Sequence, residues 1–600
     1  MNRESRIQNR ESIKLKNARI IIIFSLLLIG SFLALGGRCF YLQFCKGGHY
    51  IDAASKQQRA FASRLPQRGA ILDCRGRVLA ASNKIQIIRA DPFIIDDPKE
   101  VSSELAPILD MGAHEICKLI MDRKGKRYVR IKDNADPCEC DLAGRVHLGI
   151  VVESDWRRHY PTGSLVANII GFTDPYGLGL EGIELKYDAQ LAGSPARNVF
   201  FADVRRRPIC PKEQDGVLAN GVGIILTIDA TIQQFARDEL LKQYQEYQAE
   251  SAVAIVAEPK TGAILAMVSL PDFDPSNRNC DPNNFRSRAL TDWYEPGSIL
   301  KPFAVAAALD AGAIKKNDII FCENGSYSGK GFGRIGEYRR GFGNLTIAEI
   351  LIESSNIGMA KIGQKLGKEK LYEGLRLFGF GSKTGIELPG EVNGLLRDPA
   401  AWDGYSITRI PFGQEICVTG IQLIRAFCIL ANGGRLVRPF IVRAIVDHNG
   451  QISEGTRDEK TMDDGRVASG HSSVVSRPSS LVTPPVGYII KPEIAEWLVK
   501  EALVRVINEG TGKRAKLDKW QVFGKTGTAN IALSDARGFS DQDYVASFMA
   551  GAPVEDPTVV VLVSIRRPNL ALGKGYSGGV VAAPVGAKII ERTLTYLGVE

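Results

Sequence analysis

The sequence predicts an α+β protein in which an antiparallel sheet is backed by terminal helices and a helical subdomain is inserted. Strand-like apolar runs lie at both ends of residues 221–600, and the chain from residue 298 to 432 is largely helical. Elements that each bury one apolar face pack into layers of this kind. Before this body we expect a mixed pedestal domain at residues 38–220 and an apolar helix at the N-terminus.

The N-terminus predicts a membrane anchor. Residues 1–19 carry six basic side chains against two acidic ones, and residues 20–37 carry no charge. An apolar run of this length approaches what a bilayer requires, and the basic flank predicts a cytoplasmic N-terminus. The alternative is a signal peptide cleaved near residues 34–36, for which the apolar run is long.

Charge and cysteine content narrow the function classes. The tail supplies +4 of the net charge of +9, so the body gives no indication of nucleic-acid binding. The eleven cysteines are scattered, and Cys138 and Cys140 form the one close pair. With no histidine at ligand spacing we expect no metal site and no cofactor, and the sequence fixes no disulfide pairing.

The region from residue 38 to 220 shows short strands and turns, such as residues 68–73, but no catalytic constellation. We therefore expect a spacer or docking domain. Its turn segments near Arg158 and Glu181 are the expected contacts for a partner protein.

The body begins near Gly221. Residues 224–228 form an apolar strand, and Asp229 is placed to cap the helix that follows. Residues 252–257 and 263–268 then predict a hairpin.

After residue 298 the capping signals become clear. Thr346 and Glu349 form a capping box at the start of a short helix, and a second helix ends at Gly367. Residues 448–485 are rich in Ser, Gly and charge without periodicity, so we expect an exposed, disordered insertion there. The body is completed by strands at 520–528, 544–552 and 558–565 and a helix over 585–594.

A serine and a lysine stand three residues apart after a chain break. Pro296 and Gly297 precede Ser298, and Lys301 shares its helix face. A serine hydroxyl is a weak nucleophile without an activating base. Alone, this S-x-x-K spacing is a weak signal.

Two further motifs follow in order. Ser354 and Asn356 give S-x-N, and residues 525–528 give K-T-G-T. The three together are the set described for penicillin-binding proteins and serine β-lactamases. A second K-T-G at residues 383–385 lies between turn-rich segments, so we interpret it as a loop. The copy at Lys525 follows a strand-like run and is the one that we assign to the site.

From residue 68 onward the chain resembles a class B penicillin-binding protein, a monofunctional peptidoglycan D,D-transpeptidase of the division-type (septal) branch. Cys74-Arg75 departs from that family's pattern, but it lies in the pedestal. The resemblance implies the transpeptidase fold shared with serine β-lactamases. It is carried by residues 288–298, 378–381, 388–391, 431–434, 576–579 and 582–585, and in the pedestal by residues 68–73 and 158–163.

The resemblance implies cleavage of a terminal D-Ala from a D-Ala-D-Ala stem peptide and transfer of the acyl group to a neighbouring stem, with possible D,D-carboxypeptidase side activity. Ser298 would be the nucleophile and Lys301 the base, with its pKa lowered by burial near Lys525. Ser354 would relay a proton to the leaving amine. The expected substrate-binding residues are Asn356 for an amide and Lys525, Thr526, Gly527 and Thr528 for the terminal carboxylate. Backbone N–H groups of Ser298 and Thr528 would form the oxyanion hole.

The resemblance also implies partners and a location. We expect peptidoglycan stem peptides as substrate, β-lactams as covalent inhibitors, and a separate septal glycan polymerase with other division proteins. The anchor would hold the catalytic domain outside the bacterial cytoplasmic membrane in a single pass. The alternatives are an elongation-type enzyme, a membrane-bound β-lactam sensor, a β-lactamase and a degenerate scaffold.

Overall fold

The computed structural model divides the chain into two compact units. Unit 1 comprises Met1–Pro66 and Ser194–Ala219, and unit 2 comprises Gln67–Gly193 and Asn220–Glu600. The structure describes residues 3–50, 59–64, 66–123, 126, 128–194, 196–202, 208–215, 219–337, 341–447, 451–454, 487–532 and 538–600.

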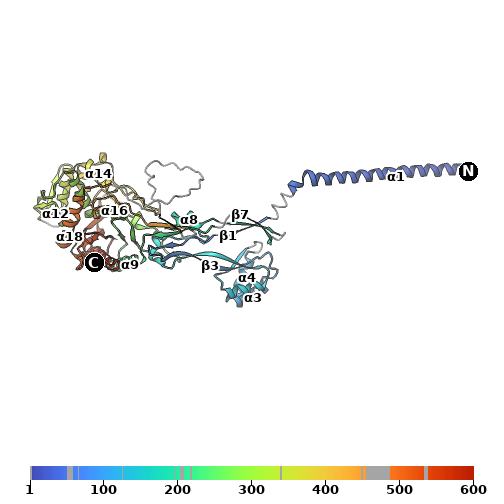
Figure 1. The fold of residues 1–600 in the computed structure, drawn as a ribbon, viewed down its shortest axis with the longest axis horizontal. Helices are drawn as coiled ribbons and strands as arrows, with labels where there is room; N and C mark the ends of the chain where they lie inside the picture. Colours follow the sequence, from blue (N-terminus) through green and yellow to red (C-terminus); the bar gives the residue numbers. More distant parts are fainter. Residues whose placement is uncertain are drawn as a thin grey trace. The chain divides into compact units, whose positions relative to one another are not determined.

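Unit 1 contains the N-terminal helix and a small sheet (Figure 1). Helix α1 runs over Arg3–Phe40 and continues into a π-helical turn at Tyr41–Cys45. Strands β1 (Arg59–Arg64), β6 (Ala196–Ala202) and β7 (Pro208–Asp215) pair antiparallel in the order β1-β6-β7.

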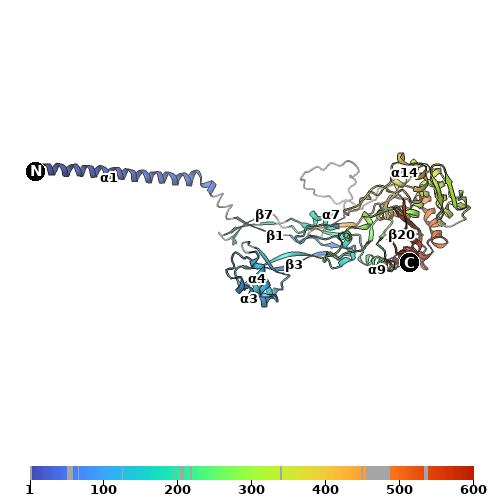
Figure 2. The same cartoon turned by 180° about the vertical axis from the view of Figure 1, so that it is seen from behind.

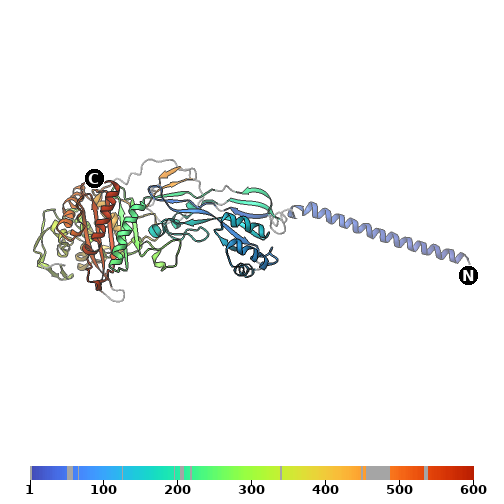
Figure 3. The ribbon, with the colours of Figure 1, turned by 90° about the horizontal axis from the view of Figure 1, so that it is seen from below.

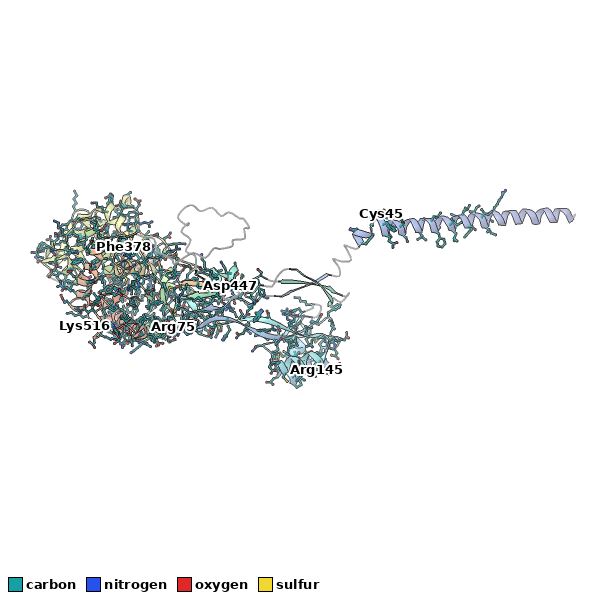
Figure 4. All side chains as sticks on the ribbon, in the orientation of Figure 1. Cys45, Arg75, Arg145, Phe378, Asp447 and Lys516 are labelled. Carbon is teal, nitrogen blue, oxygen red and sulfur yellow. The ribbon has the colours of Figure 1, made fainter. Side chains whose placement is uncertain are left out.

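The apolar part of α1 is longer than the predicted residues 20–37. Within the part of the chain that the structure describes, Arg19–Cys45 is the one stretch long and apolar enough to cross a membrane, with a mean hydropathy of 2.6. Its side chains from Arg19 to Phe40 are all exposed (Figure 4). The prediction of an apolar N-terminal helix is confirmed, and the helix continues past the glycines at which the sequence placed its end.

The first part of unit 2 is a seven-stranded sheet with three helices against it. Figure 1 shows α3 and α4 side by side at one end of β3. Ile88 of the sheet, Leu105 of α3 and Ile116 of α4 share one core and are fully buried. The helices are α3 (Pro98–Leu109), α4 (Ala113–Met121) and α5 (Pro137–Val146). The strands run in the order β18 (Ile452–Glu454), β17 (Val442–Val446), β8 (Gly223–Leu226), β2 (Ile71–Leu72), β3 (Val78–Ala90) and β4 (Val129–Asp133), and β5 (Ile150–His159) also pairs with β3.

This sheet crosses the predicted boundary at residue 220. Strand β8, expected to open the catalytic body, instead pairs with β2 of the pedestal and with β17. Its apolar pattern predicts a buried strand but not which partner buries it. Of the predicted insertion at residues 448–485, Gln451 and β18 are described, with β18 paired to β17; the rest lies outside the described residues.

Arg158 does not lie on a docking surface. Its side chain is 4% exposed, and its Nε lies 2.6 Å from Oε1 of Glu184, whose side chain is fully buried. Arg68 contacts the other oxygen of Glu184, also at 2.6 Å. Arg158 therefore holds the pedestal together, and its own side chain is not free for a partner. The expected contact through the segments near Arg158 and Glu181 stays a prediction. The helices of this segment are α6 (Ala167–Ile170), α7 (Gly182–Lys186) and α8 (Asp188–Ala192).

The second part of unit 2 is built on an antiparallel five-stranded sheet, as predicted. Helices α9 (Ala230–Glu246) and α20 (Ala583–Leu597) pack together on one face (Figure 3). Helix α16 (Gly420–Ala431) packs on β9 and β21, and Figure 2 shows β20 near α9 and the C-terminus. The strands run in the order β10 (Ile264–Leu270), β9 (Ser251–Ala257), β21 (Val559–Arg566), β20 (Phe539–Ala552) and β19 (Phe523–Ala532).

A helical subdomain is inserted between β10 and β19. The predicted capping box is present, because Thr346 accepts from the Glu349 N–H and Glu349 accepts from the Thr346 N–H. The main helices are α11 (Lys301–Asp310), α12 (Ile347–Ile352), α13 (Asn356–Leu366), α14 (Lys368–Leu377), α15 (Gly404–Arg409), α17 (Pro492–Trp497) and α18 (Val504–Asn508), with the short α10 (Arg288–Thr291) before and α19 (Gly578–Val581) after. Short strand pairs flank them: β11 (Trp293–Tyr294) with β16 (Val418–Thr419), β12 (Ile319–Phe321) with β15 (Asn344–Thr346), and β13 (Ser326–Gly329) with β14 (Gly333–Gly336).

Candidate active site

Ser298 lies in a tight turn directly before α11. The turn, Gly297–Leu300, is a 3-10 helix, so Lys301 begins the α-helix proper. Gly297 donates its N–H to the carbonyl of Gly413 at 3.0 Å. A Cβ on Gly413, whose φ is +86°, would lie 2.1 Å from the Gly297 carbonyl oxygen. Only glycine permits this contact, and the contact fixes the turn that presents the serine.

The two lysines of the motifs meet at Ser354. Lys301 is fully buried, and its Nζ donates to Ser354 O at 2.5 Å, Ser354 Oγ at 3.2 Å and Asn356 Oδ1 at 2.8 Å. Lys525 Nζ donates to the same Ser354 Oγ at 3.0 Å. Ser354 Oγ therefore bridges two amines that are 224 positions apart in the sequence. Motifs found separately in the sequence form one cluster.

Burial changes the acid–base properties of both amines. It lowers the pKa of Lys301 well below its ordinary value, and the positive charge of Lys525 lowers it further. Burial lowers the pKa of Lys525 to about 7. A charged ammonium loses hydration in such a site, so the neutral form is favoured. The lowered pKa favours the neutral form of Lys301, and a neutral amine can accept the proton that activation of a serine requires.

Ser354 adopts an unusual backbone conformation. Its φ is +60°, in the left-handed region that costs a non-glycine residue about 1–3 kcal/mol. Ser355 follows as the N-cap of α13, accepting from the Gly358 N–H at 2.9 Å. The turn therefore stops the preceding helix and directs Ser354 and Asn356 toward Lys301.

The K-T-G-T motif lies on β19, which is one of the two edge strands of the five-stranded sheet. A Cβ on Gly527 would lie 2.8 Å from Ile299 Cγ1 and 3.0 Å from the Pro296 carbonyl oxygen, so the strand runs directly against the serine turn. Thr526 Oγ1 lies 2.6 Å from Thr511 Oγ1, and Thr528 Oγ1 accepts from the Gly578 N–H at 3.0 Å.

The second K-T-G forms a loop, as the sequence predicted. Thr384 donates from both its N–H and its hydroxyl to Glu391 Oε1, at 2.6 and 2.7 Å. This closes a local turn, and Lys383 does not line the site cavity.

A cavity of about 740 Å³ lies beside these groups, and the buried Lys301 and Lys525 are not among its lining residues. Small-molecule and peptide sites typically have this size. It is lined by the predicted Ser298, Ser354, Asn356, Thr526 and Thr528, and also by residues that the sequence analysis did not assign, among them Glu295, Glu337, Glu353, Thr511, Lys513, Arg514, Tyr544 and Tyr576. Tyr544 and Tyr576 stack with ring centroids 4.2 Å apart. Tyr576 opens the Tyr-Ser-Gly-Gly segment that supported the resemblance, and Glu295 lies in the segment 288–298 that also supported it, so a sequence signal existed for both. Glu337 and Glu353 had no such signal.

Two family models match the chain. The penicillin-binding protein transpeptidase domain matches residues 252–591, which is more than half of the chain, and the penicillin-binding protein dimerisation domain matches residues 63–217. The chain belongs to the penicillin-binding protein transpeptidase family. With a dimerisation domain before the transpeptidase domain, it is a class B penicillin-binding protein and a serine-type acyl transferase.

Named relatives and solved structures agree with this family. Stage V sporulation protein D of Bacillus subtilis is 30% identical to this chain, and the aligned region covers 98% of this chain and 86% of that protein. Peptidoglycan D,D-transpeptidase FtsI of Escherichia coli is 28% identical over 94% and 89%. A peptidoglycan synthetase from Bifidobacterium adolescentis has a TM-score of 0.69 at 25% identity, covering 90% of this chain and 97% of that one. The structure of penicillin-binding protein 3 from Mycobacterium tuberculosis, complexed with aztreonam, has a TM-score of 0.65 at 24% identity, covering 90% of this chain and 98% of that one. This similarity shows a shared fold.

Glu295 gives a pH-dependent prediction. Burial raises the pKa of its carboxyl from 4.5 to about 7, so the folded protein holds this proton more tightly than the unfolded chain. The stabilisation that this group contributes is complete below pH 4.5 and is lost as the pH rises through 7. The free energy of unfolding falls by up to about 3 kcal/mol over this range. We expect Glu295→Gln to raise Tm at pH 8 and to leave it nearly unchanged at pH 4, as measured by thermal unfolding. An equal change of Tm at both pH values would contradict this.

Proposed function

We propose that this class B penicillin-binding protein cross-links peptidoglycan stem peptides during septal cell-wall synthesis through an acyl-enzyme on Ser298. The observation that carries the chemistry is Ser354 Oγ within hydrogen-bond distance of both Lys301 and Lys525, at 3.2 and 3.0 Å, in the cavity that Ser298 lines. This arrangement supports the assignment of a nucleophile, a base and a proton relay to one site.

In this mechanism neutral Lys301 takes the proton of Ser298, whose Oγ attacks the carbonyl of the penultimate D-Ala. The N–H groups of Ser298 and Thr528 stabilise the oxyanion, and each such donor is typically worth about 10²–10³ in rate. The proton passes through Ser354 to the nitrogen of the leaving D-Ala as the C–N bond breaks. The amine of a second stem then attacks the ester carbonyl and forms the new C–N bond. The ester C–O bond breaks, and the proton that the amine loses returns to Ser298 Oγ.

Substrate binding follows from the residues around this centre. Asn356 offers a donor and an acceptor to a peptide amide. Lys525 in its charged form, with Thr526 and Thr528 beside Gly527, suits the terminal carboxylate of the donor. A β-lactam presents an acyl carbon and a carboxylate in a similar relation, so we propose that β-lactams acylate Ser298. The structure of penicillin-binding protein 3 from Mycobacterium tuberculosis in complex with aztreonam supports this proposal.

We also propose the domain roles. Residues 1–19 form a cytoplasmic tail, residues 20–37 anchor the protein, residues 38–220 form the pedestal, and the transpeptidase domain occupies residues 221–600 outside the membrane. The exposed apolar surface of α1 supports the anchor. The pedestal and anchor would bind a septal glycan polymerase and other division proteins.

A localisation experiment tests the septal role against an elongation role. In cells depleted of the native protein, we expect the full-length protein to restore septation and a fluorescent fusion to gather at the septum. A protein lacking residues 1–38 should be acylated by penicillin in vitro at the wild-type rate but should not restore division. Fusion signal along the side wall, with loss of rod shape on depletion, would establish the elongation role instead.

A further inference from the structure

Glu337 follows strand β14 and reaches the start of α13. Its Oε2 accepts from the Asn356 N–H at 2.8 Å, and its Oε1 accepts from the Ile357 N–H at 3.1 Å and from Ser355 Oγ at 2.5 Å. The first N–H groups of a helix have no partner within the helix, and a carboxylate stabilises them. Here the carboxylate comes from a separate hairpin, 19 residues earlier in the chain.

The segment that Glu337 holds is the one that contacts Lys301. Lys301 Nζ donates to Ser354 O, Ser354 Oγ and Asn356 Oδ1. Ser354 is in a left-handed conformation that its surroundings must enforce. Glu337 accepts hydrogen bonds from Ser355, Asn356 and Ile357, the three residues that follow Ser354. It therefore fixes the position of every acceptor that the structure records for the Lys301 amine.

Glu337 also acts on Lys301 by its charge. Burial and the ammonium of Lys525 on β19 lower the pKa of Lys301, and the carboxylate of Glu337 raises it in opposition. Ser354 and Asn356, the other groups in contact, are uncharged, while Glu295 and Glu353 line the same cavity. An ordinary helix cap would lack this second effect.

We propose that Glu337 is a positioning residue for acyl transfer: it holds the Ser354–Asn356 turn against Lys301, and its negative charge offsets that of Lys525 at the base. This rests on the proposed function, in which Lys301 is the base. The residue acts through Lys301 and Ser354, and it takes no part in bond making.

The pH profile of acylation separates this role from simple capping. The second-order rate of acylation of the full-length protein by fluorescent penicillin is measured between pH 5 and pH 9. In Glu337→Gln we expect the acidic limb of the pH–rate profile, where the rate rises as Lys301 loses its proton, to move to lower pH by about one unit. Removing the negative charge of Glu337 favours the neutral form of the Lys301 amine. The plateau rate should fall several-fold, because the amide cannot replace all three hydrogen bonds.

Two variants serve as controls. Glu337→Asp keeps the charge but shortens the reach, so its acidic limb should stay with the wild type while its plateau falls. Glu349→Gln removes a comparable capping carboxylate from α12 at Thr346, away from Lys301, and should leave the limb in place.

An acidic limb that stays in place, or moves to higher pH, in Glu337→Gln would overturn the inference, as would a shifted limb in Glu337→Asp. Failure of the proposed function is distinguishable. It would appear as a wild-type rate and profile in Lys301→Ala, whatever the Glu337 variants show.

Discussion

We expect the Ser298→Ala protein to bind no penicillin covalently, because the ester can form only on that hydroxyl. In Lys525→Ala the acylation rate should fall roughly 10²-fold or more, since truncating a buried charged partner costs about 2–5 kcal/mol. Lys383→Ala should react at the wild-type rate, because its K-T-G forms a loop held by Glu391. Labelling with fluorescent penicillin, followed by gel electrophoresis, measures all three.

The paired lysine variants make this a test of position as well as of chemistry. Both substitutions remove a lysine from a K-T-G sequence, but only Lys525 contacts Ser354. Label on Ser298→Ala, or loss of label confined to Lys383→Ala, would show that the site is assigned to the wrong residues.

The parts of the site that the sequence predicted are those with local signals. The spacing of Ser298 and Lys301 is a property of one helical turn, and the capping box at Thr346 is a property of four consecutive residues. The strand context of Lys525 separated it from Lys383. In each case the interaction that fixes the residue lies within a short segment, so a pattern records it.

The parts that the sequence did not predict depend on contacts between distant segments. Glu337 lies in a turn-rich hairpin, and nothing local indicates that its carboxylate reaches the N-terminus of α13. The apolar run of β8 predicts burial, but its pairing with β2 depends on the whole sheet. Arg158 lies in a charged segment typical of a surface, and its side chain is buried through its contact with Glu184, which the local sequence does not indicate.

The buried ion pairs of the pedestal predict a large loss of stability. Glu184 is fully buried between Arg68, which is 6% exposed, and Arg158, which is 4% exposed. Removing one partner of a buried ion pair typically costs about 3–5 kcal/mol, because the other charge remains without compensation. Glu184→Gln leaves Arg158 facing a neutral amide and leaves Arg68 with the carboxylate of Asp188, 2.7 Å away, so we expect a fall of several degrees in Tm by calorimetry. Acylation at low temperature should persist, because every group of the site lies outside the pedestal.

Glu181→Gln is the matched control for this loss. Glu181 lies three residues earlier, is half-buried and forms none of the ion pairs recorded among the described residues, so the substitution should change Tm by less than a degree or two. Equal Tm values for the two variants would show that the pedestal does not depend on these ion pairs.

The same geometry decides how an Arg158→Glu variant is to be interpreted. It would set a second carboxylate beside Glu184 and leave Arg68 to face both, so a failure of that variant to support division would reflect pedestal folding and would carry no information about a partner.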